Sequence, residues 1–273
     1  MNHFVVDEIK CRRDGICVAV CPVGILTHGE AAPPELSAGA ESLCISCGHC
    51  VAACPYGACS LAAMPVDTCP PLRPEWLLSP EQAEHFLRSR RSIRVYKDVQ
   101  VDPGRLEHLI RVARYAPSGH NRQPVRWLVV SGQEQVRALA AHVADWMRQL
   151  LETEPARGRQ MLLDRIVAGW DAGTDLICRH APHLLITHAA KSDPTAPGAC
   201  TIALAYLELA APSFHLGACW AGYLHTAAQH WPPLQTALAL PAGEQFCGAL
   251  MVGEPRYRYH RLPSRREPQI TWR

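Results

Sequence analysis

The sequence predicts an α+β fold in two parts, a small cysteine-rich domain followed by a larger domain of helices packed on a sheet. Nine of the thirteen cysteines lie between Cys11 and Cys69. Apolar residues make up 48% of the 273-residue chain, which is enough to build a sizeable core. Helical and strand patterns follow one another after residue 79 without a regular βαβ alternation, which favours an α+β arrangement over a parallel sheet.

Charge and hydropathy argue against several classes of partner. The net charge of +2 is too small to indicate nucleic acid or an anionic membrane. The first ten residues lack a basic segment followed by an apolar run, so no secretory signal is visible. The most apolar stretch, residues 199–216, is interrupted by Glu208, Pro212 and His215 and predicts a buried helix rather than a membrane span. We therefore expect a cytoplasmic protein whose clustered thiols are metal ligands rather than disulfides.

The elements follow in order along the chain. Residues 1–64 form a cysteine-rich domain too short to be well stabilised by an apolar core alone. The prolines of residues 65–78 indicate an extended linker. Ser79 and Gln82 predict a capping box at the start of the first helix, and Asp102 predicts the start of a second. Periodicity then predicts a buried strand at 127–131, a helix at 133–153, a strand at 183–188, a helix at 199–217 and a strand at 246–252.

The second cysteine run carries the most specific motif in the chain. It reads Cys44-x2-Cys47-x2-Cys50-x3-Cys54-Pro55. In this spacing three cysteines wrap one iron–sulfur cubane, and the fourth points to another cluster. A zinc site is the rival interpretation, because paired CxxC elements also bind zinc. Three cysteines at x2 intervals followed by x3-Cys-Pro fit a cubane better than a tetrahedral ion.

The first cysteine run matches the second when the two are aligned on their Cys-Pro ends, except that Asp14 stands where a cysteine is expected. It reads Cys11-x5-Cys17-x3-Cys21-Pro22. The two runs together resemble the two-cluster bacterial ferredoxins, and the resemblance implies crossed ligation. One [4Fe-4S] cluster would be held by Cys44, Cys47, Cys50 and Cys21. The other would be held by Cys11, Cys17 and Cys54, with Asp14 as the candidate fourth ligand.

Two hypotheses remain open for Asp14. A carboxylate is a harder ligand than a thiolate, so an iron held by Asp14 should be labile, and the second cluster would interconvert between [4Fe-4S] and [3Fe-4S] forms. Alternatively, Asp14 is only a solvated loop residue and the cluster has three irons permanently.

The larger domain has neither a G-x-G-x-x-G nor a P-loop motif, so the usual phosphate signatures are missing. Arg90, Ser92 and Arg94 alternate in the segment after the first helix. In an extended segment such residues project to one side, so these three form a fork for a phosphate group. A charge run alone is more often a solvated surface, but three further segments strengthen the interpretation. They are residues 116–124, 216–222 and 252–266.

These four segments, in this order, resemble the nitroreductase family over residues 79–273. The resemblance implies an α/β/α sandwich with a mainly antiparallel central sheet, FMN held at a homodimer interface and a C-terminal dimerisation tail. By analogy Arg90, Ser92 and Arg94 bind the FMN phosphate, with Arg261 or Arg265 adding charge. The residues implied at the isoalloxazine ring are Pro117, Ser118, Gly119, Asn121, Gln123, Ala221 and Gly222. The family often has tryptophan after Gln-Pro, where this chain has Val125.

A chain with both clusters and a flavin is expected to be an oxidoreductase. Clusters pass single electrons, whereas a flavin handles one or two, so FMN can link them to a two-electron substrate. The leading hypothesis is reduction of a small electron-poor compound, a nitroaromatic or a quinone, with NAD(P)H or an external electron carrier as donor. The alternatives are reductive dehalogenation or flavin fragmentation on the same fold, and a non-catalytic electron-transfer or redox-sensing protein. No catalytic side chain is identified, because the reactive chemistry belongs to the flavin.

The remaining candidates are expected to be structural. Cys178, His180 and His183 could suggest a metal site, but they precede an apolar strand, where a satisfied histidine is the commoner outcome. Five further cysteines are expected to be small buried apolar residues. They are Cys59, Cys69, Cys200, Cys219 and Cys247.

Overall fold

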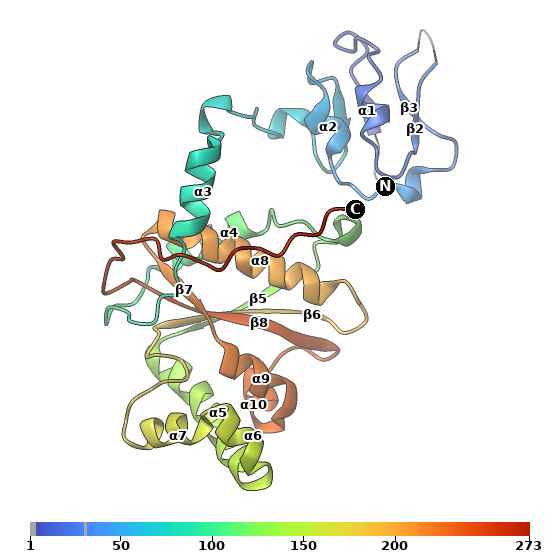
Figure 1. Cartoon of the computed structure of the whole chain (residues 1–273). Helices are drawn as coiled ribbons and strands as arrows, with labels where there is room; N and C mark the ends of the chain where they lie inside the picture. The colour runs from blue at the N-terminus through green and yellow to red at the C-terminus, as the bar shows by residue number, and fades with distance from the viewer. Residues whose placement is uncertain (1–3, 30–31) are drawn as a thin grey trace. The chain divides into compact units, whose positions relative to one another are not determined.

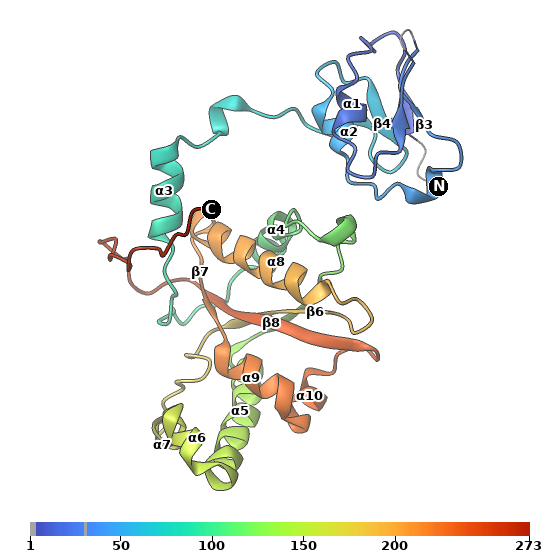
Figure 2. The ribbon, with the colours of Figure 1, turned by 45° about the vertical axis from the view of Figure 1, so that its right-hand side comes forward.

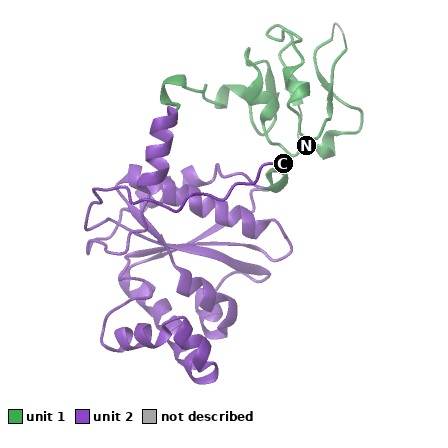
Figure 3. Cartoon of the chain, viewed as in Figure 1, with its two compact units in different colours: residues 1–77, 119–122 green, residues 78–118, 123–273 purple. Residues whose placement is uncertain are grey.

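The computed structural model describes residues 4–29 and 32–273, and the chain divides into two compact units (Figure 1). The first unit comprises Met1–Leu77 and Gly119–Arg122, and the second comprises Leu78–Ser118 and Gln123–Arg273. Figure 3 shows the two units in different colours. Residues 65–78, expected as a linker, contain two 3-10 turns, η2 (Val66–Thr68) and η3 (Pro74–Trp76). The expected domain boundaries themselves stay a prediction.

The first unit is built from two short helices and two antiparallel strand pairs. Strand β1 (Phe4–Val6) pairs with β4 (Cys59–Leu61), and β2 (Leu26–Thr27) pairs with β3 (Glu35–Leu36). Helices α1 (Ile16–Ala19) and α2 (His49–Ala53) contact each other. The buried core consists of Cys17, Leu26, Cys50, Val51, Cys59 and Leu61. Half of these core side chains are cysteines, so whatever binds the thiols also holds the unit together.

The second unit contains a four-stranded antiparallel sheet with the strand order β5-β6-β8-β7. Its strands are β5 (Arg126–Ser131), β6 (His183–Ala190), β7 (Gly217–Trp220) and β8 (Glu244–Gly253). Successive side chains of a strand point to opposite faces of the sheet. Accordingly, Leu184 and Ile186 of β6 lie in one core, while Leu185 lies in another. Both faces of the sheet are covered, and the predicted α+β class with an antiparallel central sheet is confirmed.

Helices cover both faces of the sheet (Figure 1, Figure 2). Helices α4 (Pro103–Ala113) and α8 (Ala196–Ala210) pack together on one face. The other face carries α5 (Gln133–Thr153), α6 (Pro155–Gln160), α7 (Leu163–Asp171), α9 (Gly222–His230) and α10 (Pro232–Leu238). Helix α5 has the bounds that its periodicity predicted. Among the described residues, no helix has the length and apolar character needed to cross a bilayer.

Both predicted helix starts are confirmed. The Ser79 hydroxyl accepts a hydrogen bond from the Gln82 N–H at 3.2 Å, and Gln82 Oε1 accepts one from the Ser79 N–H at 2.9 Å. This capping box opens helix α3 (Pro80–Ser89). Asp102 Oδ1 accepts from the Arg105 N–H at 3.1 Å and opens α4 in the same way. Each cap satisfies backbone donors that have no partner inside the helix.

Two expectations about elements are wrong. The strand predicted as buried at 127–131 is β5, an edge strand, and none of its residues is fully buried. The helix predicted to reach residue 217 ends as α8 at Ala210, and η5 (Ala211–Phe214) and then β7 follow it. Pro212 has no N–H to continue a helix, and His215 adopts a left-handed φ of 55°. The chain therefore leaves the helix and returns as a strand.

Candidate functional site

The first unit contains two cavities lined by cysteines from both runs. The cysteines of the first cavity are Cys21, Cys44, Cys47 and Cys50. Contact between α1 and α2 brings Cys21, at the end of the first run, to the three cysteines of the second. Apolar side chains complete the wall, namely Phe4, Ile25, Leu26, Leu36 and Leu61. These four cysteines are the set expected to hold the first cluster.

The second cavity is lined by Cys11, Asp14, Cys17 and Cys54, the set expected at the second cluster. Cys59 also lines this cavity. Sequence reasoning missed it, because Cys59 was expected to be a small buried apolar residue like four other cysteines. Cys59, Cys200, Cys219 and Cys247 are buried as expected, whereas Cys69 is partly exposed.

Backbone amides surround the cysteine that ends each run. Burial raises the pKa of the Cys21 thiol, but the N–H groups of residues 23–26 outweigh burial and hold this pKa below its ordinary value. Cys54 is arranged in the same way, with burial opposed by N–H groups between residues 56 and 59, and its pKa is also lowered. The Ala58 N–H donates to Cys54 Sγ at 3.3 Å. The thiolate is the form that binds metal, so amides that stabilise it favour ligation.

The donor chemistry of the two cavities fits iron–sulfur clusters, since soft thiolates and N–H donors to sulfur meet in each, and apolar side chains also line the first. By contrast, the part of the chain that the structure describes contains no three Cys, His, Asp or Glu side chains placed to hold a single metal ion. His183 Nε2 accepts from the Val101 N–H at 3.0 Å, and His180 Nε2 accepts from the Asp175 N–H at 3.2 Å. Both imidazoles thus bind backbone groups.

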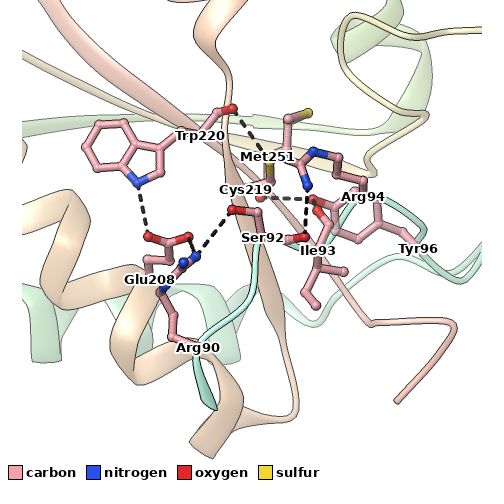
Figure 4. A network of polar contacts seen from close by, with 9 residues as sticks. All are labelled: Arg90, Ser92, Ile93, Arg94, Tyr96, Glu208, Cys219, Trp220 and Met251. Atoms are coloured by element: carbon pink, nitrogen blue, oxygen red, sulfur yellow. Dashed lines mark hydrogen bonds and ion pairs between the residues drawn. The ribbon is translucent and has the colours of Figure 1, made fainter. Parts of the chain in front are cut away.

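In the second unit, the predicted phosphate fork lies in a polar network (Figure 4). The Ile93 N–H donates to the Ala218 carbonyl of β7 at 2.9 Å, which places the fork segment against the sheet. Arg90 Nη1 donates to Ser92 Oγ at 3.2 Å, and Arg94 Nη1 donates to the Ser92 carbonyl at 3.5 Å. Both arginines therefore contact Ser92, Arg90 at its hydroxyl and Arg94 at its carbonyl.

Glu208 of α8 is a further residue of this network, which sequence reasoning noted only as an interruption of an apolar stretch. Glu208 is 7% exposed. Glu208 Oε1 accepts from Arg90 Nη1 at 2.8 Å, and Oε2 accepts from Trp220 Nε1 at 3.0 Å (Figure 4). A buried carboxylate is costly unless it is paired. A single acidic residue in an apolar helix was thus the signal that could have predicted a buried partner.

Cys219 lies beside this fork but is not activated. Burial raises the pKa of its thiol, and the nearby Arg94 opposes that effect only in part. A reactive cysteine needs a lowered pKa, so Cys219 lacks the setting of a nucleophile. The fork carries two guanidinium groups, and only that of Arg90 is paired with the Glu208 carboxylate, which leaves one positive charge beside several hydrogen-bond donors. This arrangement fits a phosphate group.

The loop of residues 117–123 is closed by its own side chains. The Ser118 hydroxyl accepts a hydrogen bond from the Gln123 N–H at 2.9 Å. Asn121 is grouped with the first unit, where its Nδ2 donates to the carbonyls of Ile45 at 3.2 Å and Ser46 at 2.8 Å. Its amide therefore has partners other than the expected heterocycle edge in this structure.

The other expected flavin residues lie at an exposed loop, a helix start and the tail. Pro117 and Gly119 are exposed. Ala221 is the N-cap residue of α9, Gly222 begins the helix, and no atom lies within 4 Å of the position that a Cβ on Gly222 would take. The tail arginines expected to reach the phosphate are exposed and lie in a segment without helix or strand. They are Arg261 and Arg265.

Two family models match the chain. The model described as the nitroreductase family matches residues 87–254, and the model described as a 4Fe-4S dicluster domain matches residues 9–58. A curated protein of Archaeoglobus fulgidus, provisionally named NADH dehydrogenase/NAD(P)H nitroreductase, is 35% identical over 60 residues. Those residues are 22% of this chain and 34% of that protein, so the chain matches about a third of its length.

Several solved structures share the fold. A nitroreductase with bound FMN from Bacteroides fragilis has a TM-score of 0.58 and 20% identity, covering 70% of this chain and 97% of that one. A BluB-like flavoprotein from Clostridium difficile 630 has a TM-score of 0.55 and 16% identity, covering 68% and 94%. An iodotyrosine deiodinase bound to FMN and 3-iodo-L-tyrosine has a TM-score of 0.52 and 23% identity, covering 70% and 98%. At these identities the likeness concerns the fold.

Proposed function

The chain belongs to the nitroreductase family and carries a 4Fe-4S dicluster domain before it, and on this basis we propose that it passes electrons between two iron–sulfur clusters and FMN to reduce a small electron-poor organic compound. The observation that carries the proposal is the crossed lining of the two cavities, in which Cys21 joins the second run and Cys54 joins the first. A nitroaromatic or quinone is the proposed substrate class.

The proposed FMN site is built around the fork. Arg90, Ser92 and Arg94 would hold the phosphate, with Arg261 or Arg265 adding charge. The residues proposed along the isoalloxazine ring are Pro117, Ser118, Gly119, Asn121, Gln123, Ala221 and Gly222. Bound FMN would supply one- and two-electron chemistry, and bound clusters would supply single electrons. The chain itself would orient the cofactors and exclude water.

Specific contacts of the chain support that orienting role. Glu208 holds the Arg90 guanidinium beside Ser92, so one donor of the fork is ordered before any anion arrives. The bond from Ile93 to Ala218 fixes the fork to the sheet. Preordered donors cost less conformational entropy on binding than mobile ones. The open space at Gly222 leaves room for a flat ring to approach the start of α9 closely.

A homodimer is proposed, with the C-terminal tail as a dimerisation element. After Gly253 the described chain has no helix or strand. Large apolar and aromatic side chains of the tail are nevertheless exposed, among them Tyr257, Ile270 and Trp272, the last at 88%. Aromatic residues are enriched in protein interfaces, so their exposure supports a partner surface.

Turnover by anaerobically purified protein, replete in iron, sulfide and FMN, tests the proposal. The acceptor panel contains a nitroaromatic, a quinone and a halogenated aromatic, and the donors are NADH, NADPH and a low-potential one-electron reductant. We expect the nitroaromatic or the quinone to be reduced. With the one-electron donor, Cys47→Ser should lose most of this rate, whereas the matched variant Cys69→Ala should keep it, because Cys47 lines a cluster cavity and Cys69 does not.

Three outcomes would contradict parts of the proposal. Turnover of no acceptor would point to a non-catalytic electron carrier. Preferential turnover of the halogenated aromatic would move the substrate class to dehalogenation. An unchanged rate in Cys47→Ser, in a preparation shown to lack the first cluster, would remove the clusters from the electron path. Stopped-flow bleaching of the flavin separates donation by NAD(P)H from donation through the clusters.

A further inference from the structure

We infer that Cys59 supplies the fourth thiolate of the second cluster, in the role that the sequence pattern gives to Asp14. This ligation presupposes the clusters of the proposed function. It would give both cavities four cysteine ligands and would make the second cluster a [4Fe-4S] cluster rather than a three-iron one. Four observations on the described residues carry the assignment.

The first observation is that the two cysteine runs share a backbone conformation. Helix α1 begins after Gly15, which has a φ of 72° and a ψ of 1°. Helix α2 begins after Gly48, which has a φ of 74° and a ψ of 6°. The residue two positions before each glycine also has a positive φ, 57° at Arg13 and 51° at Ser46. Superposing the runs in this register places Asp14 opposite Cys47. Asp14 thus stands where the second run has a cysteine ligand, but it offers a carboxylate in place of a thiolate.

The second observation concerns the ends of the runs in the same register. The aligned segments are Cys21-Pro22-Val23-Gly24-Ile25-Leu26 and Cys54-Pro55-Tyr56-Gly57-Ala58-Cys59. Cys59 therefore stands opposite Leu26. Leu26 is 5% exposed and lines the first cavity, and Cys59 is 2% exposed and lines the second. The cysteine absent at position 14 is matched by one present at position 59, on the wall of the same cavity.

The third observation is that Asp14 and Cys59 lie in different environments. Asp14 is exposed, and its Oδ1 accepts a hydrogen bond from the Ile16 N–H at 3.1 Å, at the start of α1. Cys59 is buried, and it lines the second cavity together with Cys17 and Cys54. The Asp14 carboxylate thus already accepts a hydrogen bond from the backbone, while Cys59 lies among the expected ligands.

The fourth observation is the rigid support of Cys59. It is the first residue of β4 and pairs with Val6 of β1 in an antiparallel register. Its backbone is thus held by a strand, whereas Asp14 lies in a loop. Iron in a sulfide cluster prefers soft thiolate to carboxylate. When the Cys59 sulfur binds iron, the thiol proton passes to water and the oxidation state of the cluster does not change.

The test uses the full chain, reconstituted without air from ferrous iron and sulfide, in four forms. These are the wild type, Cys59→Ala, Asp14→Ala and the control Cys69→Ala. Iron and sulfide per chain are measured together with the EPR spectrum of the mildly oxidised protein. We expect Cys59→Ala to lose one iron per chain and to show the signal of an oxidised three-iron cluster. Asp14→Ala and Cys69→Ala should match the wild type.

The first cluster serves as an internal folding control, because its EPR signal on reduction reports an intact first unit. If Cys59→Ala does not fold, Cys59→Val fills the buried site with an apolar side chain, as Leu26 does in the first cavity, and is expected to give the same three-iron signal. Wild-type iron content in either folded Cys59 variant overturns the inference, and so does a three-iron signal from Asp14→Ala alone. A wild-type preparation without iron would instead contradict the proposed function.

Discussion

Glu208 shows how one buried side chain can organise a binding surface. Its carboxylate accepts hydrogen bonds from both Arg90 and Trp220, so each of its two oxygens has a partner. Breaking a fully buried ion pair costs about 3–5 kcal/mol. The cost here should be smaller, since 24% of the Arg90 side chain is exposed. Even so, the pair is strong enough to hold Arg90 beside Ser92, which leaves Arg94 as the cation that no carboxylate in the network contacts.

Replacing Arg94 should therefore weaken FMN binding without damaging the fold. A hydrogen bond to a charged group contributes about 1.5–3 kcal/mol, so Arg94→Gln should raise the Kd for FMN by about tenfold to a hundredfold. Fluorescence quenching of FMN titrated with apoprotein measures this Kd.

The matched control for that titration is Arg91→Gln. Arg91 lies three positions before Arg94 in the same segment and lines a cavity with Tyr257 and Tyr259, a cavity that none of the three fork residues lines. Its substitution should leave the Kd within about twofold, because it is not part of the fork. Equal losses in both variants would show that general positive charge, and not the fork, attracts the phosphate.

At the scale of elements, strand β7 sets the position of the fork. Its Ala218 carbonyl accepts from the Ile93 N–H, and Gly217 lies directly under the Ile93 side chain. A Cβ at Gly217 would come within 2.4 Å of Ile93 Cγ1 and 2.7 Å of Ile93 Cβ. The absence of a side chain at this position is thus what allows the segment of Ser92 and Arg94 to lie against the sheet.

Gly217→Ala should consequently lower both stability and FMN affinity. Overpacking of this kind costs about 1–3 kcal/mol, because Ile93 can relieve the clash only by moving its own segment. We expect a lower free energy of unfolding in urea, measured at fixed FMN concentration, and a higher Kd for FMN.

Gly198→Ala is the control at this scale. Gly198 lies in helix α8, is exposed and has no atom within 4 Å of the position that an alanine methyl group would take. Alanine there should raise stability by about 0.5–1 kcal/mol, since glycine is a poor helix former, and should leave FMN binding unchanged. A Gly217→Ala protein as stable as the wild type would show that the fork segment is free to shift.

At the scale of the whole molecule, each of the two units is stabilised internally in a different way. The second unit has extensive apolar cores on both faces of its sheet. The first has one small core in which Cys17, Cys50 and Cys59 take up half of the buried positions. A domain of this size is marginal without added cross-links or metal. Cluster binding should therefore contribute much of the folding free energy of the first unit.

Removal of iron from the full-length holoprotein should unfold the first unit and spare the second. After oxidation in the presence of EDTA, we expect limited proteolysis to cut rapidly within residues 4–77, while the fragment from about residue 78 stays resistant and retains FMN. Cleavage sites are mapped by mass spectrometry. Reconstitution with iron and sulfide should restore protection. Unchanged protection of residues 4–77 in iron-free protein would mean that the apolar core suffices.

Features that depend on neighbours along the chain could be predicted from the amino-acid sequence alone. The spacing of the cysteine runs depends only on local loops, and the capping box at Ser79 joins residues three apart. The periodicity of α5 likewise needs only one helix. Family resemblance then predicted the antiparallel sheet correctly. Local structure of this kind can be predicted because it is determined by a few dihedral angles of neighbouring residues.

Features that join distant segments became visible only in the folded chain. Cys59 was expected to be inert, and its place on the wall of the second cavity depends on the pairing of β4 with β1. Arg90, one of the two partners of Glu208, lies 118 residues away from it, and the edge position of β5 depends on strand order. Such contacts are selected by the packing of the whole unit, where burial of apolar surface outweighs local preference. For that reason a cysteine that looked like a small apolar residue came to lie beside the expected cluster ligands.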